Sequence, residues 1–236
     1  MIPLHKSDDL VPWVERSFGY VFRTPTLCDA ALTHRSAGAD HNERLEFLGD
    51  SILNCAVARM LFDAHPLADE GALSRLRASL VSGETLAQIA GELGLGEVLR
   101  LGPGELKSGG FRRASILADA LEAILGAIFL DAGFDAAAAA VARIIGPRLS
   151  GLPAADALKD PKTRLQEVLQ ARGLALPTYT LTAVSGDPHA QAFIVTCEVP
   201  VLAVIAVGEG ASRRRAEQLA AAKVIELLPA ELRVRA

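Results

Sequence analysis

“ERLEFLGDS” (residues 43–51) places three carboxylates inside a stretch whose other residues are mostly apolar. If residues 41–64 form a helix, Glu43, Glu46 and Asp50 stand at positions i, i+3 and i+7 and share one face. The other faces carry Leu, Phe, Ile and Val, so little room is left for a solvated side. A buried, ionised carboxylate costs several kcal/mol unless it is paired or bound to a metal. The stretch therefore predicts a core helix whose acids need a positive partner.

A second apolar segment, “ASILADALEAILGAIFLDAG” (114–133), repeats this feature. Asp119 and Glu122 stand at i and i+3 on one face of a predicted helix. Two apolar helices that pack together would pool four or five carboxylates. Ordinary buried ion pairs are one way to neutralise them, and the candidates for that role are Arg44, Arg59 and Arg77.

A hard divalent cation fits the acids better than buried ion pairs do. Carboxylate oxygens without a nearby Cys or a well-spaced His favour Mg²⁺ or Mn²⁺ over Zn²⁺. A di-iron site in a helical bundle would need Glu-x-x-His pairs. Here the third residue after Glu43 is Glu46, and the third residue after Asp119 is Glu122. The pattern therefore disfavours redox chemistry.

The composition is that of a globular protein, since half of the 236 residues are hydrophobic and 5% are aromatic. This is enough chain for one or two domains with cores. The first residues contain no apolar run typical of a signal peptide, and no window reaches the roughly 20 apolar residues of a membrane-spanning helix. We therefore expect a cytoplasmic protein without a membrane partner. We also expect buried, reduced thiols, and neither a disulfide framework nor a zinc site, at Cys28, Cys55 and Cys197.

The charge is distributed unevenly along the chain. Residues 1–150 have a net charge of −5 and residues 151–236 of +1, which together give the overall −4. An acidic average argues only weakly against a nucleic-acid partner, because it hides local differences. The acidic excess lies in the part of the chain that contains the two acid-bearing helices.

The sequence predicts an all-α domain over residues 1–149. Apolar residues recur there at three- and four-residue spacing. Gly and Pro in “LGPGELKSGG” (101–110) mark a long loop. Gly, Pro and Ser then break the periodicity, which predicts a linker at 150–159. The predicted helices are 10–17, 26–32, 41–64, 70–90, 115–131 and 135–149.

The tail, residues 160–229, changes to a period of two. Asp160 and Pro161 predict the N-cap and first position of a helix that closes at Gly173. The order α-β-β-β-α predicts a small α+β domain with helices on one face of an antiparallel sheet. The expected strands are “TYTLTAV” (178–184), “QAFIVTCEV” (191–199) and “VLAVIAVG” (201–208), with a turn at “GDPH” (186–189) and a last helix from Ser212 to Leu228.

Three blocks of this sequence resemble the conserved blocks of the ribonuclease III family, in the family's order. “NERLEFLGDS” (42–51) resembles the family signature, and “DEGALSRLRASLVSGETLA” (69–87) and “RRASILADALEAILGAIFLDAG” (112–133) resemble the other two. The tail resembles the family's double-stranded-RNA-binding domain. The resemblance implies a Mg²⁺-dependent endoribonuclease, with Mn²⁺ as a substitute and no small-molecule cofactor. It also implies cleavage of double-stranded RNA by two metal ions to products with 5′-phosphate ends.

The resemblance assigns roles to the acids when they are matched position by position. It implies metal ligands at Glu46, Asp119 and Glu122, catalytic residues at Asp50 and Glu122, and secondary acids of the active site at Glu43 and Glu70. For Glu70 the alternative is an ordinary first-turn acid that the helix dipole favours.

Two other residues of the signature have roles that differ from those of the acids. Gly49 inside a helix costs about 1 kcal/mol relative to Ala, which is tolerated where another backbone approaches closely. Phe47 is a large apolar residue, and a core position is one interpretation of it. The resemblance implies a homodimer with one centre per subunit, each cutting one strand, and places Phe47 at the dimer interface.

RNA contacts are expected on three surfaces of the tail. Three arginines, 213–215, occupy the first turn of the last helix, where the dipole disfavours cations but where a phosphate binds well. A solvated basic run is the alternative. The first helix and the Pro-His loop complete the surface by resemblance, and such a domain spans about 16 base pairs with little sequence preference. The expected RNA-binding residues are Thr163, Gln166, Glu167, His189, Arg213, Arg214 and Arg215, with Lys107, Arg112 and Arg113 of the loop 106–115 as further candidates.

The resulting hypothesis is a two-domain endoribonuclease that processes precursors of ribosomal RNA and some messenger and transfer RNAs. A non-catalytic double-stranded-RNA-binding regulator and a helical metal-dependent oxidoreductase are the alternatives. The intact acid set argues against the first alternative. The absence of Glu-x-x-His pairs argues against the second.

Overall fold

The computed structural model describes residues 7–152, 159–187 and 191–233. The chain forms two compact units, Met1–Ala155 and Asp156–Ala236. Much of the predicted linker, residues 153–158, and the predicted RNA-binding residue His189 lie outside the described residues. Within the described part, no helix has the length and apolar character needed to cross a membrane.

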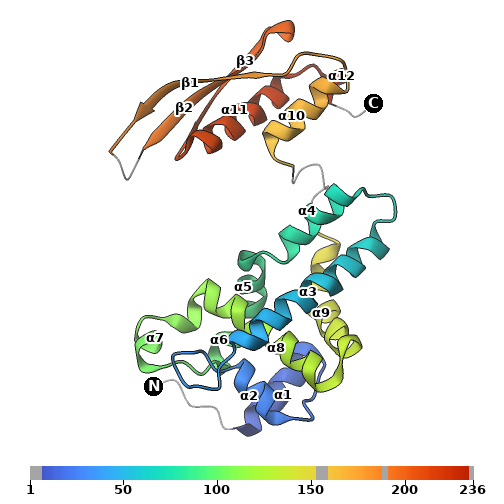
Figure 1. Ribbon diagram of the computed structural model, residues 1–236, viewed down its shortest axis with the longest axis vertical. Helices are drawn as coiled ribbons and strands as arrows, with labels where there is room; N and C mark the ends of the chain where they lie inside the picture. Colours follow the sequence, from blue (N-terminus) through green and yellow to red (C-terminus); the bar gives the residue numbers. More distant parts are fainter. Residues whose placement is uncertain (1–6, 153–158, 188–190, 234–236) are drawn as a thin grey trace. The chain divides into compact units, whose positions relative to one another are not determined.

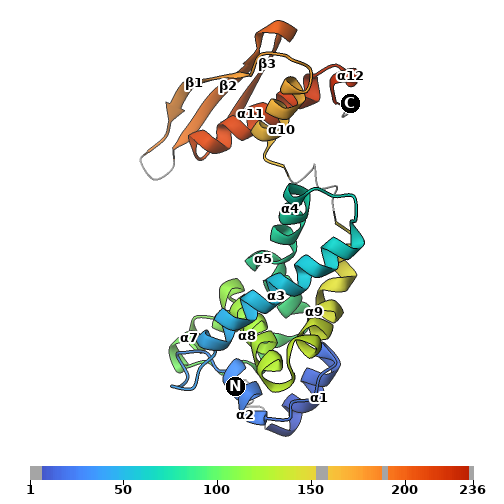
Figure 2. The same ribbon diagram turned by 45° about the vertical axis from the view of Figure 1, so that its right-hand side comes forward.

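The first unit is helical (Figures 1 and 2). Its elements in chain order are α1 (Ser7–Phe18), α2 (Pro25–Ala31), α3 (Glu43–Ala64), α4 (Glu70–Leu80), α5 (Gly83–Glu92), α6 (Leu95–Val98), α7 (Pro103–Lys107), the 3₁₀ turn η1 (Gly110–Arg112), α8 (Ala114–Ala132) and α9 (Phe134–Leu149).

Helix α8 forms the centre of this unit and packs against α2, α3, α5 and α9. Its apolar residues surround most of the helix, which is typical of a buried helix and not of a surface one. Leu121, Ile124, Leu125 and Ile128 are fully buried. The helix that carries Asp119 and Glu122 is therefore the least solvated element of the unit.

Two predictions about helix boundaries were wrong. The predicted helix 70–90 is two helices, α4 and α5, because Ser82 caps a new one: its hydroxyl accepts a hydrogen bond from the Thr85 amide at 3.2 Å. The predicted loop 101–110 contains α7, which begins at Pro103. A proline suits the first helical position because its missing amide would have no partner there.

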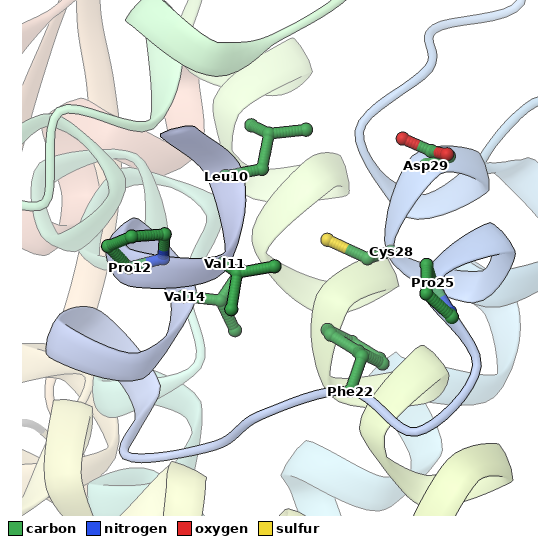
Figure 3. Close-up of a pocket in the computed structure, with 8 residues that line it drawn as sticks. All are labelled: Leu10, Val11, Pro12, Val14, Phe22, Pro25, Cys28 and Asp29. Atoms are coloured by element: carbon green, nitrogen blue, oxygen red, sulfur yellow. The ribbon is translucent and has the colours of Figure 1, made fainter. Parts of the chain in front are cut away.

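A cavity of about 440 Å³ lies between α1 and α2 (Figure 3). Leu10, Val14 and Phe22 line it together with the thiol of Cys28. Burial, aided by the charge of Asp29, raises the pKa of Cys28 to about 11, so this thiol stays protonated at neutral pH. The cavity is therefore apolar, and its thiol is a weak nucleophile.

The three thiols are free, and two of them, Cys28 and Cys197, are buried as predicted. The prediction of a buried thiol was wrong for Cys55, which is exposed. Cys55 lies on the outer face of α3, where Ser51 and Arg59, one turn away on either side, are also exposed.

The second unit is a three-stranded antiparallel sheet of order β1-β2-β3 with helices on one face (Figure 1). This confirms the predicted α-β-β-β-α order. Its elements are α10 (Pro161–Gln170), β1 (Thr178–Ser185), β2 (Ala192–Val199), the 3₁₀ turn η3 (Pro200–Leu202), β3 (Val204–Gly210), α11 (Arg213–Leu227) and α12 (Ala230–Arg233).

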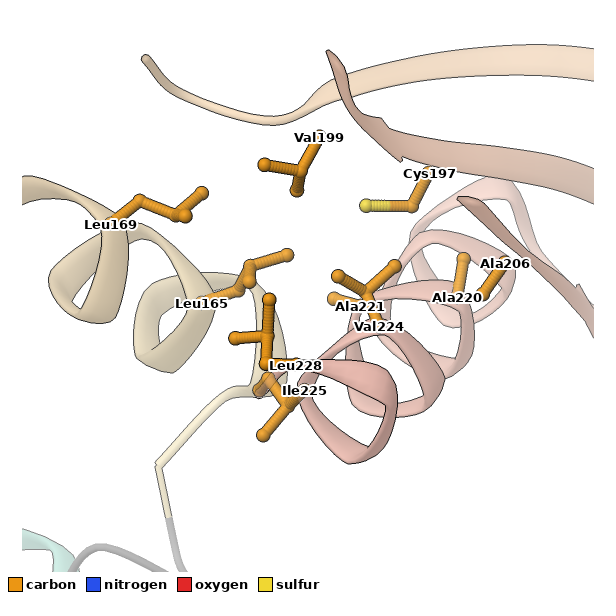
Figure 4. Close-up of a cluster of buried hydrophobic side chains, with 10 residues drawn as sticks. All are labelled: Leu165, Leu169, Cys197, Val199, Ala206, Ala220, Ala221, Val224, Ile225 and Leu228. Carbon is orange, nitrogen blue, oxygen red and sulfur yellow. The ribbon is translucent and has the colours of Figure 1, made fainter. Parts of the chain in front are cut away.

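The core of the second unit lies between the sheet and the two long helices (Figure 4). Leu165 of α10, Val199 of β2 and Val224 of α11 are fully buried in it. A glycine allows β3 to approach α11 closely, since a Cβ atom at Gly208 would overlap the carbonyl oxygen of Ala216. Helix α11 is therefore held tightly against the sheet.

Two strand predictions need correction. Strand β3 begins at Val204 and not at residue 201, because η3 and Ala203, with φ of 51°, form the turn after β2. Strand β1 contains a bulge between Leu181 and Ala183. The predicted alternation is interrupted there, and Leu181 is 38% exposed.

Candidate active site

Helices α3 and α8 approach each other closely at two glycines. A Cβ atom at Gly49 would overlap the backbone carbonyl of Glu122, and one at Gly126 would overlap the carbonyl oxygen of Leu45. The expectation that Gly49 marks a close approach of another backbone is confirmed. Because the two backbones nearly touch, the acidic side chains of both helices converge beside the contact.

Three acids from these two helices lie together. Glu46 of α3 and Asp119 and Glu122 of α8 each place a carboxylate oxygen within 4.8 Å of the others. All three side chains are partly buried. The structure therefore brings together the three residues that the sequence predicted as metal ligands. We call them the acid cluster.

The acid cluster has an excess of negative charge, which the pKa values reflect. Burial raises the pKa of Glu122 to about 8, and the charges of Asp50, Glu46 and Asp119 add to this effect. Burial also raises the pKa of Glu46, together with the charges of Asp119, Glu43 and Asp50. For Asp119 burial raises the pKa while His34 and Arg35 oppose it. The cluster needs either protons or a cation to be stable at neutral pH.

Asp50 lies one turn after Glu46 on α3 and is more exposed than the three clustered acids. Asn54, one turn further on, donates a hydrogen bond to the Asp50 carboxylate at 2.8 Å and another to its backbone carbonyl at 3.0 Å. Asn54 was not among the residues predicted from the sequence. The sequence could have indicated this contact, because an amide four residues after an acid lies on the same helical face.

A cavity of about 320 Å³ adjoins the cluster and is lined by both basic and acidic side chains, among them Glu46 and Asp119. Glu43 lines it and forms an ion pair with Arg35 at 3.0 Å. Arg35 was not predicted from the sequence, because no periodic spacing links it to Glu43. It reaches this position because the backbone of the adjacent His34 is hydrogen-bonded to residue 100 at 3.0 Å.

The alternative of neutralisation by buried arginines finds no support at Arg59. This residue pairs with Asp63 at 2.7 Å on the exposed side of α3. Arg44 is exposed. Arg77 lies on α4 and does not line the cavity beside the acids. Among the described residues, Arg35 opposes the raised pKa of Glu46 and Asp119, and its own side chain is 69% exposed.

Two other predicted residues are not members of the cluster. Glu70 begins α4 and accepts a hydrogen bond from the Ser74 hydroxyl at 2.8 Å, and it is not among the residues that line the cavity beside the acids. Phe47 is 79% exposed, which contradicts the interpretation as a core residue. Phe62 of the same helix is also exposed.

The predicted tail contacts that fall within the described residues lie on two helices. Thr163, Gln166 and Glu167 are exposed on α10, on the side opposite the buried Leu165. Glu167 forms an ion pair with Lys159 at 2.5 Å. Residues 213–215 are exposed at the start of α11.

The N-terminal end of α11 is capped as its sequence suggests. Ser212 is the N-cap, and its hydroxyl accepts a hydrogen bond from the Arg215 amide at 3.2 Å. In the loop 106–115, Arg112 stacks over Phe111 at 5.1 Å and Arg113 pairs with Glu105 at 3.0 Å. RNA contact by this loop stays a prediction.

Both units match known families. The ribonuclease-III-like family matches residues 24–149, and the double-stranded RNA binding motif matches residues 161–228. The chain belongs to the ribonuclease III family. It is an endoribonuclease that cleaves double-stranded RNA, and the predicted fold class and enzyme class are confirmed. The regulator and oxidoreductase alternatives lose their support.

Two ribonucleases 3 match this chain over most of their own length. Ribonuclease 3 of Thiobacillus denitrificans is 58% identical over 88% of this chain and 92% of its own. Ribonuclease 3 of Pseudomonas fluorescens is 55% identical over 92% of this chain and 95% of its own. Among solved structures, the nuclease domain of ribonuclease III from Campylobacter jejuni matches with a TM-score of 0.57 and 42% identity, covering 59% of this chain and 99% of that one. That structure is described as showing flexibility in a region involved in dimer formation.

Proposed function

We propose that the acid cluster holds the divalent metal of this endoribonuclease, with Glu46, Asp119 and Glu122 as ligands. Mg²⁺ is the expected ion and Mn²⁺ a substitute. The observation that carries the proposal is the convergence of three carboxylates, from two helices in glycine-mediated contact, within 4.8 Å of one another. The family is generally metal-dependent, which supports the same assignment.

The residues fit a hard cation. All donors in the cluster are carboxylate oxygens, which suit Mg²⁺ and Mn²⁺ better than Zn²⁺. The raised pKa of Glu122 means that the isolated cluster retains a proton near neutral pH, and a cation would replace that proton. When bound, two metal ions would activate the attacking water and stabilise the leaving oxygen of the phosphodiester.

The remaining acids have separate roles in this proposal. Asp50 acts with Glu122 as a catalytic residue, and Asn54 fixes the direction of its carboxylate through the 2.8 Å hydrogen bond. Glu43 is a secondary acid of the active site, and Arg35 orients it. We propose the same role for Glu70 on the family resemblance alone, because it does not line the cavity beside the acids. The products would carry 5′-phosphate and 3′-hydroxyl ends, as the family resemblance implies.

The tail would hold the duplex for cleavage. The exposed side chains of α10 meet the minor groove, and the arginines at the start of α11 contact phosphates. His189 and the loop 106–115 complete the expected contacts. The substrates we propose are precursors of ribosomal RNA and some messenger and transfer RNAs, processed in the cytoplasm.

We propose further that the enzyme is a homodimer in which each subunit cuts one strand. Phe47 and Phe62 expose large apolar side chains on α3, with 79% and 67% of their surface accessible. Exposed aromatic residues of this size are typical of interface positions. Phe47 is the proposed contact residue.

A cleavage assay on long duplex RNA tests the central proposal. Wild-type protein with Mg²⁺ should cleave, and both chelator and Glu122→Gln should abolish cleavage while RNA binding is retained. Glu84→Gln, a change of the same kind at an exposed position of α5, should cleave like wild type. Equal cleavage by Glu122→Gln and wild type would disprove the site assignment.

A further inference from the structure

Two cations of the tail converge on one carboxylate. On α11, Arg213 Nε donates to Glu217 Oε1 at 3.0 Å, and on α10, Lys162 Nζ donates to Glu217 Oε2 at 2.5 Å. The Glu217 side chain is only 13% exposed, whereas Arg213 is 61% exposed. Glu217 therefore sits between the helices, below the surface on which RNA is expected to bind.

A second carboxylate lies beside this group. Asp160, the N-cap of α10, accepts hydrogen bonds from the Lys162 amide at 2.9 Å and from Gln218 at 2.7 Å. Its carboxylate is 4.0 Å from the guanidinium of Arg214. The second arginine of the first turn therefore also faces a negative charge.

The pairing changes the charge that RNA encounters. Hydrogen bonds from Lys162 lower the pKa of Glu217, so this carboxylate is ionised throughout the neutral range. Because its side chain is largely buried, water and salt screen it less than they screen a surface acid. A phosphate that approaches Arg213 must therefore compete with a carboxylate that is already in place.

The pairing with Glu217 also explains the direction of the Arg213 side chain. The salt bridge to residue 217 draws its guanidinium one turn along α11, away from the helix N-terminus, where a phosphate binds best. Lys162 is held on its other side by the ring of Tyr179, 4.5 Å from its Nζ. Both cations are thus occupied within the domain.

We propose that Glu217 is an internal counter-ion that limits the affinity of the tail for RNA phosphates. The proposal rests on the proposed role of the arginine cluster in RNA binding and adds the residue that sets its strength. The net charge of residues 151–236 is only +1, so a single internal counter-ion is a large part of the charge balance of this domain. An enzyme that must release cleaved duplex gains from such a limit, because product release controls turnover in many enzymes.

Glu217→Gln in the full chain is the direct test. Binding of a fluorescently labelled RNA duplex is measured by anisotropy in EDTA, so that no RNA is cleaved, across a range of salt concentrations. The variant should bind about 3- to 10-fold more tightly near 0.1 M salt, and the slope of log K against log salt should steepen by about 1 for each cation released. Unchanged or weaker binding by a folded variant would overturn the proposal.

Matched variants separate the local effect from general charge. Glu226→Gln removes the same charge from an exposed position further along α11 and should leave the slope unchanged. An equal gain in both variants would count against a specific counter-ion. Asp160→Asn keeps an N-capping residue and removes the charge beside Arg214, so it should also tighten binding. If Glu217→Gln does not fold, RNA binding by Asp160→Asn tests the proposal in its place.

The arginines themselves distinguish this inference from the proposed function. Replacing residues 213–215 together by Gln should abolish most binding, and unchanged binding would refute the proposed RNA contact. Arg213→Gln alone should change the salt slope little in the wild-type chain but strongly in the Glu217→Gln chain. Equal effects in both backgrounds would refute the counter-ion while leaving the RNA contact intact.

Discussion

The acid cluster and the charged groups at the α10–α11 contact, which are Asp160, Lys162, Arg213, Arg214 and Glu217, both concentrate charge. The two sites balance this charge differently. In the cluster, burial and repulsion raise the pKa of Glu122 to about 8. Arg35, which opposes the same effect at Glu46 and Asp119, is largely exposed. At the α10–α11 contact, Glu217 and the N-cap residue Asp160 each face a cation of the same unit at 2.5–4.0 Å. In our proposals, an ion from outside the chain completes the acid cluster, whereas carboxylates of the chain itself limit the positive charge of the tail.

The largest effect should come from separating α3 and α8. A methyl group at Gly49 would overlap the Glu122 backbone, so Gly49→Ala must move one helix or strain both. We expect the free energy of unfolding to fall by about 2 kcal/mol or more, with loss of cleavage. Chemical denaturation of the purified protein measures the first, and the duplex cleavage assay measures the second.

Gly91→Ala is the matched control for this change. Gly91 lies inside α5, and no atom that the structure describes outside this helix lies within 4 Å of the position that a methyl group would take there. Alanine should raise stability by up to ~1 kcal/mol, because it favours the helix more than glycine does. Equal losses of stability at Gly49 and Gly91 would mean that overlap at the α3–α8 contact is not the cause.

The next effect reports the cost of ionising the buried Glu122 beside the other acids. Since the folded-state pKa of Glu122 lies at about 8 and its ordinary value is 4.5, its stability contribution is complete below about 4.5 and is lost as pH rises through about 8. In EDTA at pH 8.5, Glu122→Gln should therefore melt higher than wild type, by ~3 °C or more. At pH 5 the difference should shrink, because wild-type Glu122 is then protonated.

At high pH, Mg²⁺ should reverse the order of the melting temperatures of wild type and Glu122→Gln. Adding Mg²⁺ should raise the melting temperature of the wild type more than that of Glu122→Gln, because the variant has lost a charged ligand. A wild type that melts at the same temperature with and without Mg²⁺ would argue against a cation at the cluster. Thermal scans at the two pH values with both proteins provide the whole comparison.

The sequence allowed more to be predicted about the acid cluster than about the tail. Helical spacing indicated which acids share a face within α3 and within α8, and the family resemblance indicated that Glu46 joins Asp119 and Glu122 in one site. The Lys162–Glu217 pair joins residues 55 positions apart, and only packing of α10 on α11 brings them together. The helix break at Ser82 was missed because apolar spacing continues through it, although its capping side chain was visible.

Asn54→Ala should have a smaller effect, confined to catalysis. Without the 2.8 Å hydrogen bond the Asp50 carboxylate is free to rotate, and supporting residues of this kind typically contribute tenfold or more to activity. We expect kcat to fall about tenfold with unchanged RNA affinity. Gln88→Ala, which removes an exposed amide from α5, should leave kcat as it is. A change in affinity without a change in kcat would remove Asp50 from the catalytic role.

The smallest effect should come from Arg35, the cation that most nearly serves the acid cluster as an internal counter-ion. Its side chain is 69% exposed, so its charge is screened and it competes only weakly with metal for the acids. Arg35→Gln should lower the Mg²⁺ concentration for half-maximal cleavage by about twofold, because the acids lose a competing positive charge. Arg59→Gln, which breaks the pair with Asp63 on the same helix, should not change it. A large gain at Arg35 would mean that the cluster, like the tail, is moderated from within the chain, and the contrast between the two sites would disappear.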